Sequence, residues 1–260
     1  QQEPRLVTEY ALRFGLASVN KIADAYDSDP KADFHQVVAD MAKIPRSQAK
    51  VINLGLFYGM GKAKLEAELG VSSVKAKNLF DSYHAKVPFV KQLTNELMRA
   101  AQSQGRIKTI LNRKCRFPKY EPILKGNDWG RFVSAQDHER MLELQAMGPH
   151  MKDEEGEFLL DKDGNKQKNY WHENGHRRAF TYKALNKLIQ GSAADMTKKA
   201  MLELYKEGIT PHIQIHDELD ISVISDLEAA KIKDIMEHAV ELKIPNKVDY
   251  ESGPNWGSIK

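Results

Sequence analysis

Apolar residues recur every three or four positions through the first hundred residues of the chain, which is the spacing of one face of an α-helix. Leu6, Tyr10 and Phe14 begin this pattern, and Asp33 and Pro45 stand where helices typically start. The pattern predicts helices at residues 6–16, 33–42, 45–58, 62–69, 72–86 and 88–104. The first half of the chain is therefore expected to be mainly helical.

The second half of the chain mixes helical and strand patterns. Short apolar runs predict strands near residues 106–111 and 115–117. Apolar residues at the three- to four-residue spacing of a helix predict helices at 181–206 and 225–242, followed by a final strand. The residues between 126 and 175 are polar and charged, with Asp163-Gly164 as a hairpin turn. We interpret this stretch as a partly exposed insertion with no defined chemistry.

Strict alternation of apolar and polar residues surrounds one acidic dipeptide. The apolar residues of equal parity are Ile213, Ile215, Leu219, Ile221 and Val223. Asp217 shares that parity, so the pattern predicts two strands joined by a tight turn, with Asp217 and Glu218 at its tip beside a buried face. Acidic residues at a hairpin tip often have no function, and the alternation alone leaves that alternative open.

Composition narrows the possible partners of the chain. The 260 residues include 39 basic and 36 acidic side chains, for a formal net charge of +3, so any nucleic-acid surface must be local. The densest basic cluster consists of Arg106, Lys108, Arg113, Lys114, Arg116 and Lys119. These cations suit contacts with a nucleic-acid backbone, although a solvated basic hairpin is the alternative interpretation.

A single cysteine, Cys115, excludes a disulfide framework and a cysteine-based metal site. No apolar run approaches the roughly 18 residues that a membrane span needs, and no signal peptide is recognisable at the start. A lone cysteine suits a reducing compartment, so we expect an intracellular protein without a membrane partner.

The predicted helix after Pro45 carries a stripe of functional side chains. Arg46, Lys50, Leu54 and Tyr58 are spaced at four-residue intervals, so they form one slowly winding face. Two cations followed by an aliphatic and a phenol suit a nucleoside triphosphate, with its phosphates on the cations. Gly55 inside the helix suggests that something approaches the backbone closely there. An ordinary apolar stripe beside two solvated cations is the alternative.

The segment from Arg46 to Met60 reads R-x-x-A-K-x-x-N-x-G-x-x-Y-G-M and resembles the fingers helix of family A DNA polymerases, the group of bacterial DNA polymerase I and many bacteriophage replicases. His216-Asp217-Glu218 resembles the third palm motif of the same family. The first five residues resemble the tail of the first palm motif, and Asp33-Phe34-His35 resembles the Asp-x-His that precedes the fingers helix. The resemblance covers the chain except residues 126–175, and leans towards bacteriophage members.

The resemblance implies an α+β fold with an antiparallel palm sheet, backing helices and mainly helical fingers, without a thumb or exonuclease domain in this chain. It places a palm segment at 1–30, fingers at 31–120, the connecting insertion at 121–178 and further palm at 179–260. It also implies template-directed DNA polymerisation in DNA replication, with primer-template DNA and dNTP as partners.

The family's catalysis uses two Mg²⁺ ions held by carboxylates. The resemblance makes Asp217 a metal ligand and Glu218 a secondary or supporting one. The partner aspartate of the family would lie just upstream of Gln1, so we expect an upstream N-terminal polymerase portion, with a thumb and possibly an exonuclease, to be needed for activity.

For the nucleotide, the resemblance assigns the phosphates to His35, Arg46 and Lys50, with Lys50 as general acid for the departing pyrophosphate. It also pairs Glu3 with Tyr58 to exclude a 2′-hydroxyl. Leu54 stands where many relatives have an aromatic residue, and this predicts discrimination against dideoxynucleotides. As ordinary features, Glu3 would be an acid at a helix start and His35 a surface histidine.

For the DNA, the resemblance assigns minor-groove contacts to Asn186 and Gln190, one helical turn apart. Arg113 and Arg116 belong to a segment like the family's Gly-Arg-Arg, in which Asn112 replaces the glycine. The family also implies a DNA contact for His216. Two alternatives stay open: a non-catalytic DNA-binding or partner-binding fragment, and a single-subunit RNA polymerase.

Overall fold

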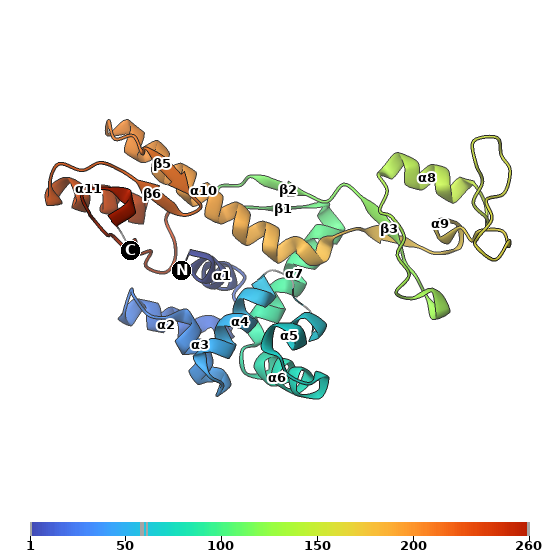
Figure 1. The fold of residues 1–260 in the computed structure, drawn as a ribbon, viewed down its shortest axis with the longest axis horizontal. Helices are drawn as coiled ribbons and strands as arrows, with labels where there is room; N and C mark the ends of the chain where they lie inside the picture. The colour runs from blue at the N-terminus through green and yellow to red at the C-terminus, as the bar shows by residue number, and fades with distance from the viewer. Residues whose placement is uncertain (1, 58–59, 61, 259–260) are drawn as a thin grey trace. The chain divides into compact units, whose positions relative to one another are not determined.

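The computed structural model describes residues 2–57, 60 and 62–258, and Figure 1 shows its fold. Contacts between residues divide the chain into two compact units. Unit 1 comprises Gln1–Leu97, Lys108–Arg113 and Leu185–Lys260. Unit 2 comprises Met98–Ile107 and Lys114–Ala184. Helices predominate, and the described strands form three two-stranded sheets, of which two are shown by their registers to be antiparallel. This confirms the α+β expectation.

The helices of the first half begin and end close to the predicted positions. They are α1 (Gln2–Arg13), α2 (Asn20–Ser28), α3 (Phe34–Ala42), α4 (Arg46–Phe57), α5 (Lys62–Leu69), α6 (Ser73–Lys86) and α7 (Pro88–Gln104). Asp33 caps α3, because its Oδ1 accepts hydrogen bonds from the backbone N–H of His35 and Gln36. Ser72 caps α6 in the same way through Lys75. The sequence pattern did not predict α2.

Helix α1 is buried around most of its circumference. Every residue from Pro4 to Ala11 is buried, including the polar Arg5, Thr8 and Glu9. Arg5 donates to the carbonyls of Pro30 and Pro245, and one oxygen of Glu9 accepts the backbone N–H of Lys243. These bonds satisfy the buried charges and join α1 to the end of the chain within unit 1.

The remaining elements are shorter, except one helix. They are β1 (Arg106–Lys108), β2 (Lys114–Arg116), β3 (Tyr120–Pro122), α8 (His138–Ala146), α9 (Tyr170–Glu173), β4 (His176–Arg178), α10 (Ala184–Lys206), β5 (Ile213–Ile215), β6 (Glu218–Asp220) and α11 (Asp226–His238). Single 3₁₀ turns are η1 (Ala17–Val19), η2 (Gly126–Asp128), η3 (Thr181–Lys183) and η4 (Trp256–Ser258).

Three predictions for the second half were wrong, two in extent and one altogether. The first strand ends at Lys108, because a turn closes immediately afterwards through hydrogen bonds between Thr109 and Arg113. The last helix ends at His238 rather than at 242. No strand follows within residues 239–258, since a strand requires a paired neighbour and none lies beside this segment.

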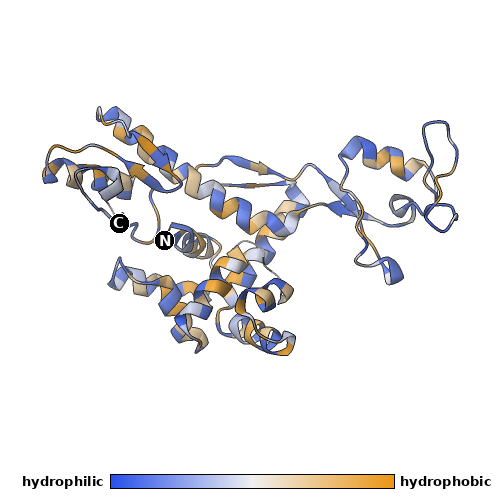
Figure 2. Ribbon diagram, viewed as in Figure 1, coloured by the Kyte–Doolittle hydropathy of each residue, from blue (hydrophilic) through white to orange (hydrophobic). Residues whose placement is uncertain are grey.

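Unit 2 has a small core of its own. Met141, Leu144 and Trp171 are buried together, with Tyr120 and Met147 among the partly buried residues packed against them. The loops that follow α8 are mostly exposed and hydrophilic, as expected for the polar insertion (Figure 2). Gly164 has a positive φ in a turn enclosed by an isolated bridge, at the predicted hairpin position.

Among the residues that the structure describes, no helix combines the length and the apolar character required to cross a bilayer.

Candidate functional site

Helix α4 presents the predicted nucleotide stripe on its less buried side. Arg46 and Lys50 are exposed and Leu54 is half-buried. The opposite face packs into unit 1 through Ala49, Ile52, Asn53 and Phe57. Tyr58, the last member of the stripe, lies outside the described residues. The exposed cations can therefore reach an anionic ligand from one helix face.

Arg46 is paired with the residue that caps the preceding helix. Its Nε donates to Asp33 Oδ2 at 2.6 Å, while Asp33 Oδ1 caps α3. Burial would raise the pKa of Asp33, but the hydrogen bonds from Arg46 and from the backbone N–H of Gln36 outweigh it and lower that pKa. One ionised carboxylate thus connects the start of α3 to the start of α4.

His35 lies in a buried polar cluster rather than on the surface. Its Nδ1 is 3.0 Å from Nδ2 of Asn53, whose Oδ1 accepts a hydrogen bond from the hydroxyl of Tyr83. The three residues come from α3, α4 and α6, and all are buried. Burial is the main cause that lowers the pKa of His35, and the neighbouring cations Arg46 and Lys50 act in the same direction. The sequence analysis did not identify Asn53 or Tyr83 as partners of His35.

Gly55 is required by a close approach from the chain itself. A Cβ at this position would lie 1.8 Å from the Cε atom of Met60, and the backbone N–H of Met60 donates to the carbonyl of Gly55 at 2.7 Å. The neighbour that the glycine predicted is therefore Met60, which is buried. This contact accounts for the glycine without involving a ligand.

The acidic hairpin forms as predicted, but part of its apolar face is exposed in the described structure. β5 and β6 pair antiparallel with Ile215 opposite Glu218, so His216 and Asp217 form a two-residue loop in which His216 has a φ of 53°. Ile213 and Ile215 are 41% and 37% exposed. The expectation of a buried face was therefore wrong for these two isoleucines, whereas Leu219, Ile221 and Val223 on the same parity are half-buried.

The carboxylates of Asp217 and Glu218 are exposed at this tip. Carboxylate oxygens are the protein ligands that Mg²⁺ prefers, so their chemistry fits that ion. In the part of the chain that the structure describes, however, no group of three or more His, Cys, Asp or Glu residues could hold a metal. The pair therefore fits as one part of a metal site, which would need a further ligand.

Helix α10 carries Asn186 and Gln190 on one face, half-buried and exposed respectively. The next turn of the helix packs closely. The hydroxyl of buried Ser192 is 2.6 Å from that of Tyr10 in α1 and accepts the backbone N–H of Ile110 at 3.2 Å. This packing positions the two amides relative to α1 within unit 1.

Arg113 is anchored on the same helix. Its Nε donates to Asp195 Oδ1 at 2.8 Å and its Nη2 donates to the carbonyl of Gly191 at 2.7 Å. Asp195 is buried and its Oδ2 has no hydrogen-bond partner. The exposed guanidinium of Arg113 is thereby held beside the turn of α10 that follows Gln190. Asp195 is a supporting residue that the sequence analysis missed.

The other predicted residues are more scattered. Glu3 is half-buried in the first turn of α1, which also fits its ordinary role as an acid at a helix start. Arg116 is exposed on β2 in unit 2, whereas the other described candidates belong to unit 1. The Glu3–Tyr58 pairing involves a residue outside the described part.

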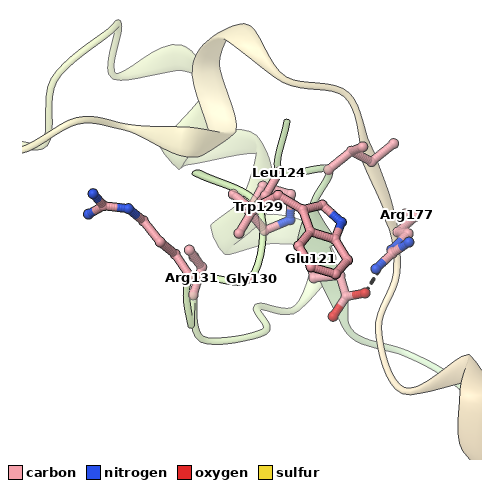
Figure 3. Close-up of a pocket in the computed structure, with 9 residues that line it drawn as sticks. Glu121, Leu124, Trp129, Gly130, Arg131 and Arg177 are labelled. Atoms are coloured by element: carbon pink, nitrogen blue, oxygen red, sulfur yellow. Dashed lines mark hydrogen bonds and ion pairs between the residues drawn. The ribbon is translucent and has the colours of Figure 1, made fainter. Parts of the chain in front are cut away.

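A separate pocket in unit 2 contains none of the predicted site residues. Its volume is about 250 Å³, and Trp129 and Arg131 line it together with an ion pair between Glu121 and Arg177 at 2.8 Å (Figure 3). Trp129 is 80% exposed, so this hollow is open rather than enclosed.

Comparisons with known proteins match this chain to DNA polymerases. The sequence model described as DNA polymerase family A matches residues 1–258. A DNA-directed DNA polymerase of Pseudomonas phage M6 is 32% identical, over 99% of this chain and 37% of that protein. DNA polymerase I of Geobacillus stearothermophilus is 28% identical, over 87% of this chain and 21% of that protein. The chain thus spans 37% and 21% of the lengths of these two relatives.

A solved structure with a similar fold is the POL domain of Pol1 from M. smegmatis in complex with DNA primer-template and dNTP. The two share 22% sequence identity with a TM-score of 0.61, over 95% of this chain and 37% of that one. At this identity, the likeness shows a common fold.

Proposed function

The chain belongs to DNA polymerase family A, and we propose that it forms the nucleotide-binding surface and part of the catalytic centre of a template-directed DNA polymerase. The reaction would add deoxynucleotides to a primer 3′ end and release pyrophosphate. Because the chain spans 37% of its relative from Pseudomonas phage M6, the proposal concerns a larger polymerase of which these residues are a part.

One observation carries this proposal: candidate residues distributed over the whole sequence belong to the same compact unit. Unit 1 contains Glu3, His35, Arg46, Lys50, Leu54, Arg113, Asn186, Gln190, His216, Asp217 and Glu218. These residues combine phosphate-binding cations, groove-reading amides and metal-binding carboxylates, which is the set of groups that templated nucleotidyl transfer requires.

The face of α4 would bind the incoming dNTP. Arg46 and Lys50 would contact the triphosphate, His35 would add a hydrogen bond, and Lys50 would donate a proton to the leaving pyrophosphate. Leu54 would lie against the sugar and base, and Glu3 with Tyr58 would exclude a 2′-hydroxyl. The exposure of both cations supports this assignment.

Asp217 would hold Mg²⁺, with Glu218 as a second or supporting ligand. Two such ions, when bound, would activate the primer hydroxyl and offset the charge that develops on the phosphates. The described residues offer no third ligand beside this pair, so a carboxylate from the rest of the protein would complete the site.

Asn186 and Gln190 would contact the minor groove of the primer-template, where the acceptors shared by all base pairs lie. Arg113, Arg116 and His216 would contact the DNA backbone. The remaining partners would be the upstream portion of the polymerase, including a thumb and possibly an exonuclease. The proposed subdomains are palm at 1–30 and 179–260, fingers at 31–120 and the insertion at 121–178, and the place of action is the cytoplasm of a bacterial or phage-infected cell.

The test is primer extension with Mg²⁺ by the full-length protein. Asp217→Asn is expected to lower the extension rate by about 1,000-fold or more, since it removes charge from a metal ligand, while primer-template binding persists. Asp226→Asn, at an exposed position in the first turn of α11, is the matched control and should retain activity. Undiminished extension by the Asp217 variant would contradict the proposal.

The alternative of a non-catalytic fragment applies to the 260 residues alone. The described residues contain no group of three or more His, Cys, Asp or Glu side chains that could hold a metal, which favours it, and we expect this chain alone to bind primer-template without extending it. Extension should appear when the upstream polypeptide is joined or added. Robust extension by the isolated chain would show that no outside carboxylate is needed, and preferential use of ribonucleotides would indicate an RNA polymerase.

A further inference from the structure

Three buried polar side chains form a hydrogen-bonded chain through the core of unit 1. His35, Asn53 and Tyr83 are 6%, 0% and 1% exposed, and they come from α3, α4 and α6. Burying three polar groups together is costly unless each has a hydrogen-bond partner. The position of each side chain and the direction of each hydrogen bond are therefore well defined.

The direction of these hydrogen bonds follows from the Tyr83 hydroxyl, which is the first donor. The hydroxyl of Tyr83 donates to Asn53 Oδ1, which leaves the amide nitrogen of Asn53 facing His35 Nδ1 at 3.0 Å. Burial raises the pKa of Tyr83 far above its ordinary value, so the phenol keeps its proton. An amide NH₂ group can only donate, and Nδ1 of His35 must therefore accept and carry no proton.

The position of the ring proton follows from the charge state of His35. Burial lowers its pKa, the cations Arg46 and Lys50 lower it further, and only Asp33 acts in the opposite direction. The imidazole is therefore neutral near pH 7 and has one N–H group. With Nδ1 as an acceptor, that proton is on Nε2, for which the described residues provide no hydrogen-bond partner.

We propose that Asn53 and Tyr83 are positioning residues that keep His35 in its Nε2–H tautomer, so that the ring donates a hydrogen bond to a phosphate oxygen of the bound nucleotide. The proposal rests on the assignment of His35 to the triphosphate. The opposite tautomer would direct a lone pair at an anionic oxygen, which is repulsive. A neutral donor also avoids adding a third cation beside Arg46 and Lys50.

The first experiment measures dNTP binding in single-turnover incorporation by the full-length protein. His35→Ala should raise the nucleotide Kd about tenfold or more, as expected for loss of a hydrogen bond to a charged group. Tyr83→Phe and Asn53→Leu should raise the Kd about threefold or more, with a smaller change in the maximal rate.

A double-mutant cycle separates positioning from general support of the fold. In the His35→Ala background, Tyr83→Phe and Asn53→Leu should leave the Kd unchanged, because the donor that they orient is gone. Effects of equal size with and without His35 would overturn the proposal. Tyr26→Phe is the matched control, since the Tyr26 hydroxyl is buried without a hydrogen-bond partner and should not affect the Kd.

The second experiment requires no nucleotide. Imidazole ¹⁵N spectra of the full-length protein, with His35 assigned by its loss in His35→Ala, should show the proton on Nε2. Tyr83→Phe should yield a mixture of both tautomers. A proton on Nδ1 in the unmodified protein would overturn the proposal, as would an unchanged Kd in His35→Ala. Polymerase activity itself is tested separately by Asp217→Asn, so failure of the two ideas can be distinguished.

Discussion

At the scale of single residues, Arg46 shows how one ion pair can orient a side chain and still leave some of its hydrogen-bond donors available. Its Nε and one terminal nitrogen both lie within 2.6 Å of the same Asp33 oxygen. A guanidinium has five N–H donors in a fixed plane, so this pairing orients the group while other donors stay available. Arg46 can therefore meet a phosphate in a defined orientation.

Leu54 provides a test of the predicted sugar contact. Leu54→Tyr in the full-length polymerase should increase dideoxynucleotide incorporation relative to deoxynucleotides by about tenfold, because the phenol supplies an aromatic face and a hydroxyl near the sugar. Leu54→Met, which adds neither, is the control. Parallel primer extensions measure the ratio, and equal terminator incorporation by the leucine and tyrosine forms would disprove the assignment.

Asn112 adopts the backbone conformation that glycine favours. It has a φ of 64° in the turn after β1, and its side chain is exposed. Asn112→Gly should change stability little, whereas Asn112→Val should lower the free energy of unfolding by about 1–2 kcal/mol, because a β-branched residue resists this conformation. Urea unfolding of the 260-residue chain measures both. Equal stability of the two variants would contradict the left-handed turn.

At the scale of elements, Asp33 links two helices through one carboxylate. Asp33→Asn keeps a helix-capping side chain but loses the charge that pairs with Arg46. We expect this substitution to lower the free energy of unfolding by about 0.5–1 kcal/mol at pH 7, which is the usual contribution of a partly exposed ion pair.

The pH dependence of this loss has a definite sign. The folded pKa of Asp33 is lowered, so its stabilisation is complete above the unfolded pKa of about 4 and disappears as the pH falls through the folded value. Urea midpoints of the two forms should differ at pH 7 and converge below pH of about 4. A difference that persisted or grew in acid would contradict the ionised contact.

Helix α10 shows how a tertiary contact can be hidden by a large separation in sequence. Its amides Asn186 and Gln190 could be placed on one face from their spacing alone. The anchoring of Arg113 by Asp195 could not, because the two residues belong to elements whose contact depends on tertiary packing. The same holds for Tyr10 and Ser192.

At the scale of the whole molecule, the two compact units should respond separately to core substitutions. Trp171→Ala should destabilise unit 2 by about 3–5 kcal/mol, because Trp171 is buried against Met141 and Leu144. Trp129→Ala, at a tryptophan that is 80% exposed in the same unit, is the matched control.

Limited proteolysis followed by mass spectrometry measures this response. New cleavage sites should appear in unit 2 of the Trp171 variant and be absent from the Trp129 variant. Protection of α4 and α10 should persist in both variants. Equal loss of protection throughout the chain would show that the units unfold together.

Local sequence patterns were sufficient to predict most of the helices, the helix cap and the hairpin, because these features depend on residues that are close together in sequence. Helical periodicity, Asp33 as a cap and the alternation around Asp217 predicted elements that the structure contains. The four-residue spacing from Arg46 to Leu54 also predicted a shared face. These features are readable because hydrogen bonding and side-chain direction repeat over a few residues.

Tertiary packing settled which of those faces are covered and which polar groups meet. The alternation at Ile213 and Ile215 specified a sheet face, but no described layer of this chain buries it. His35, Asn53 and Tyr83 meet because three helices pack together, and that contact orients the histidine. A pattern specifies the direction in which a side chain points, whereas its partner depends on what the rest of the chain places there.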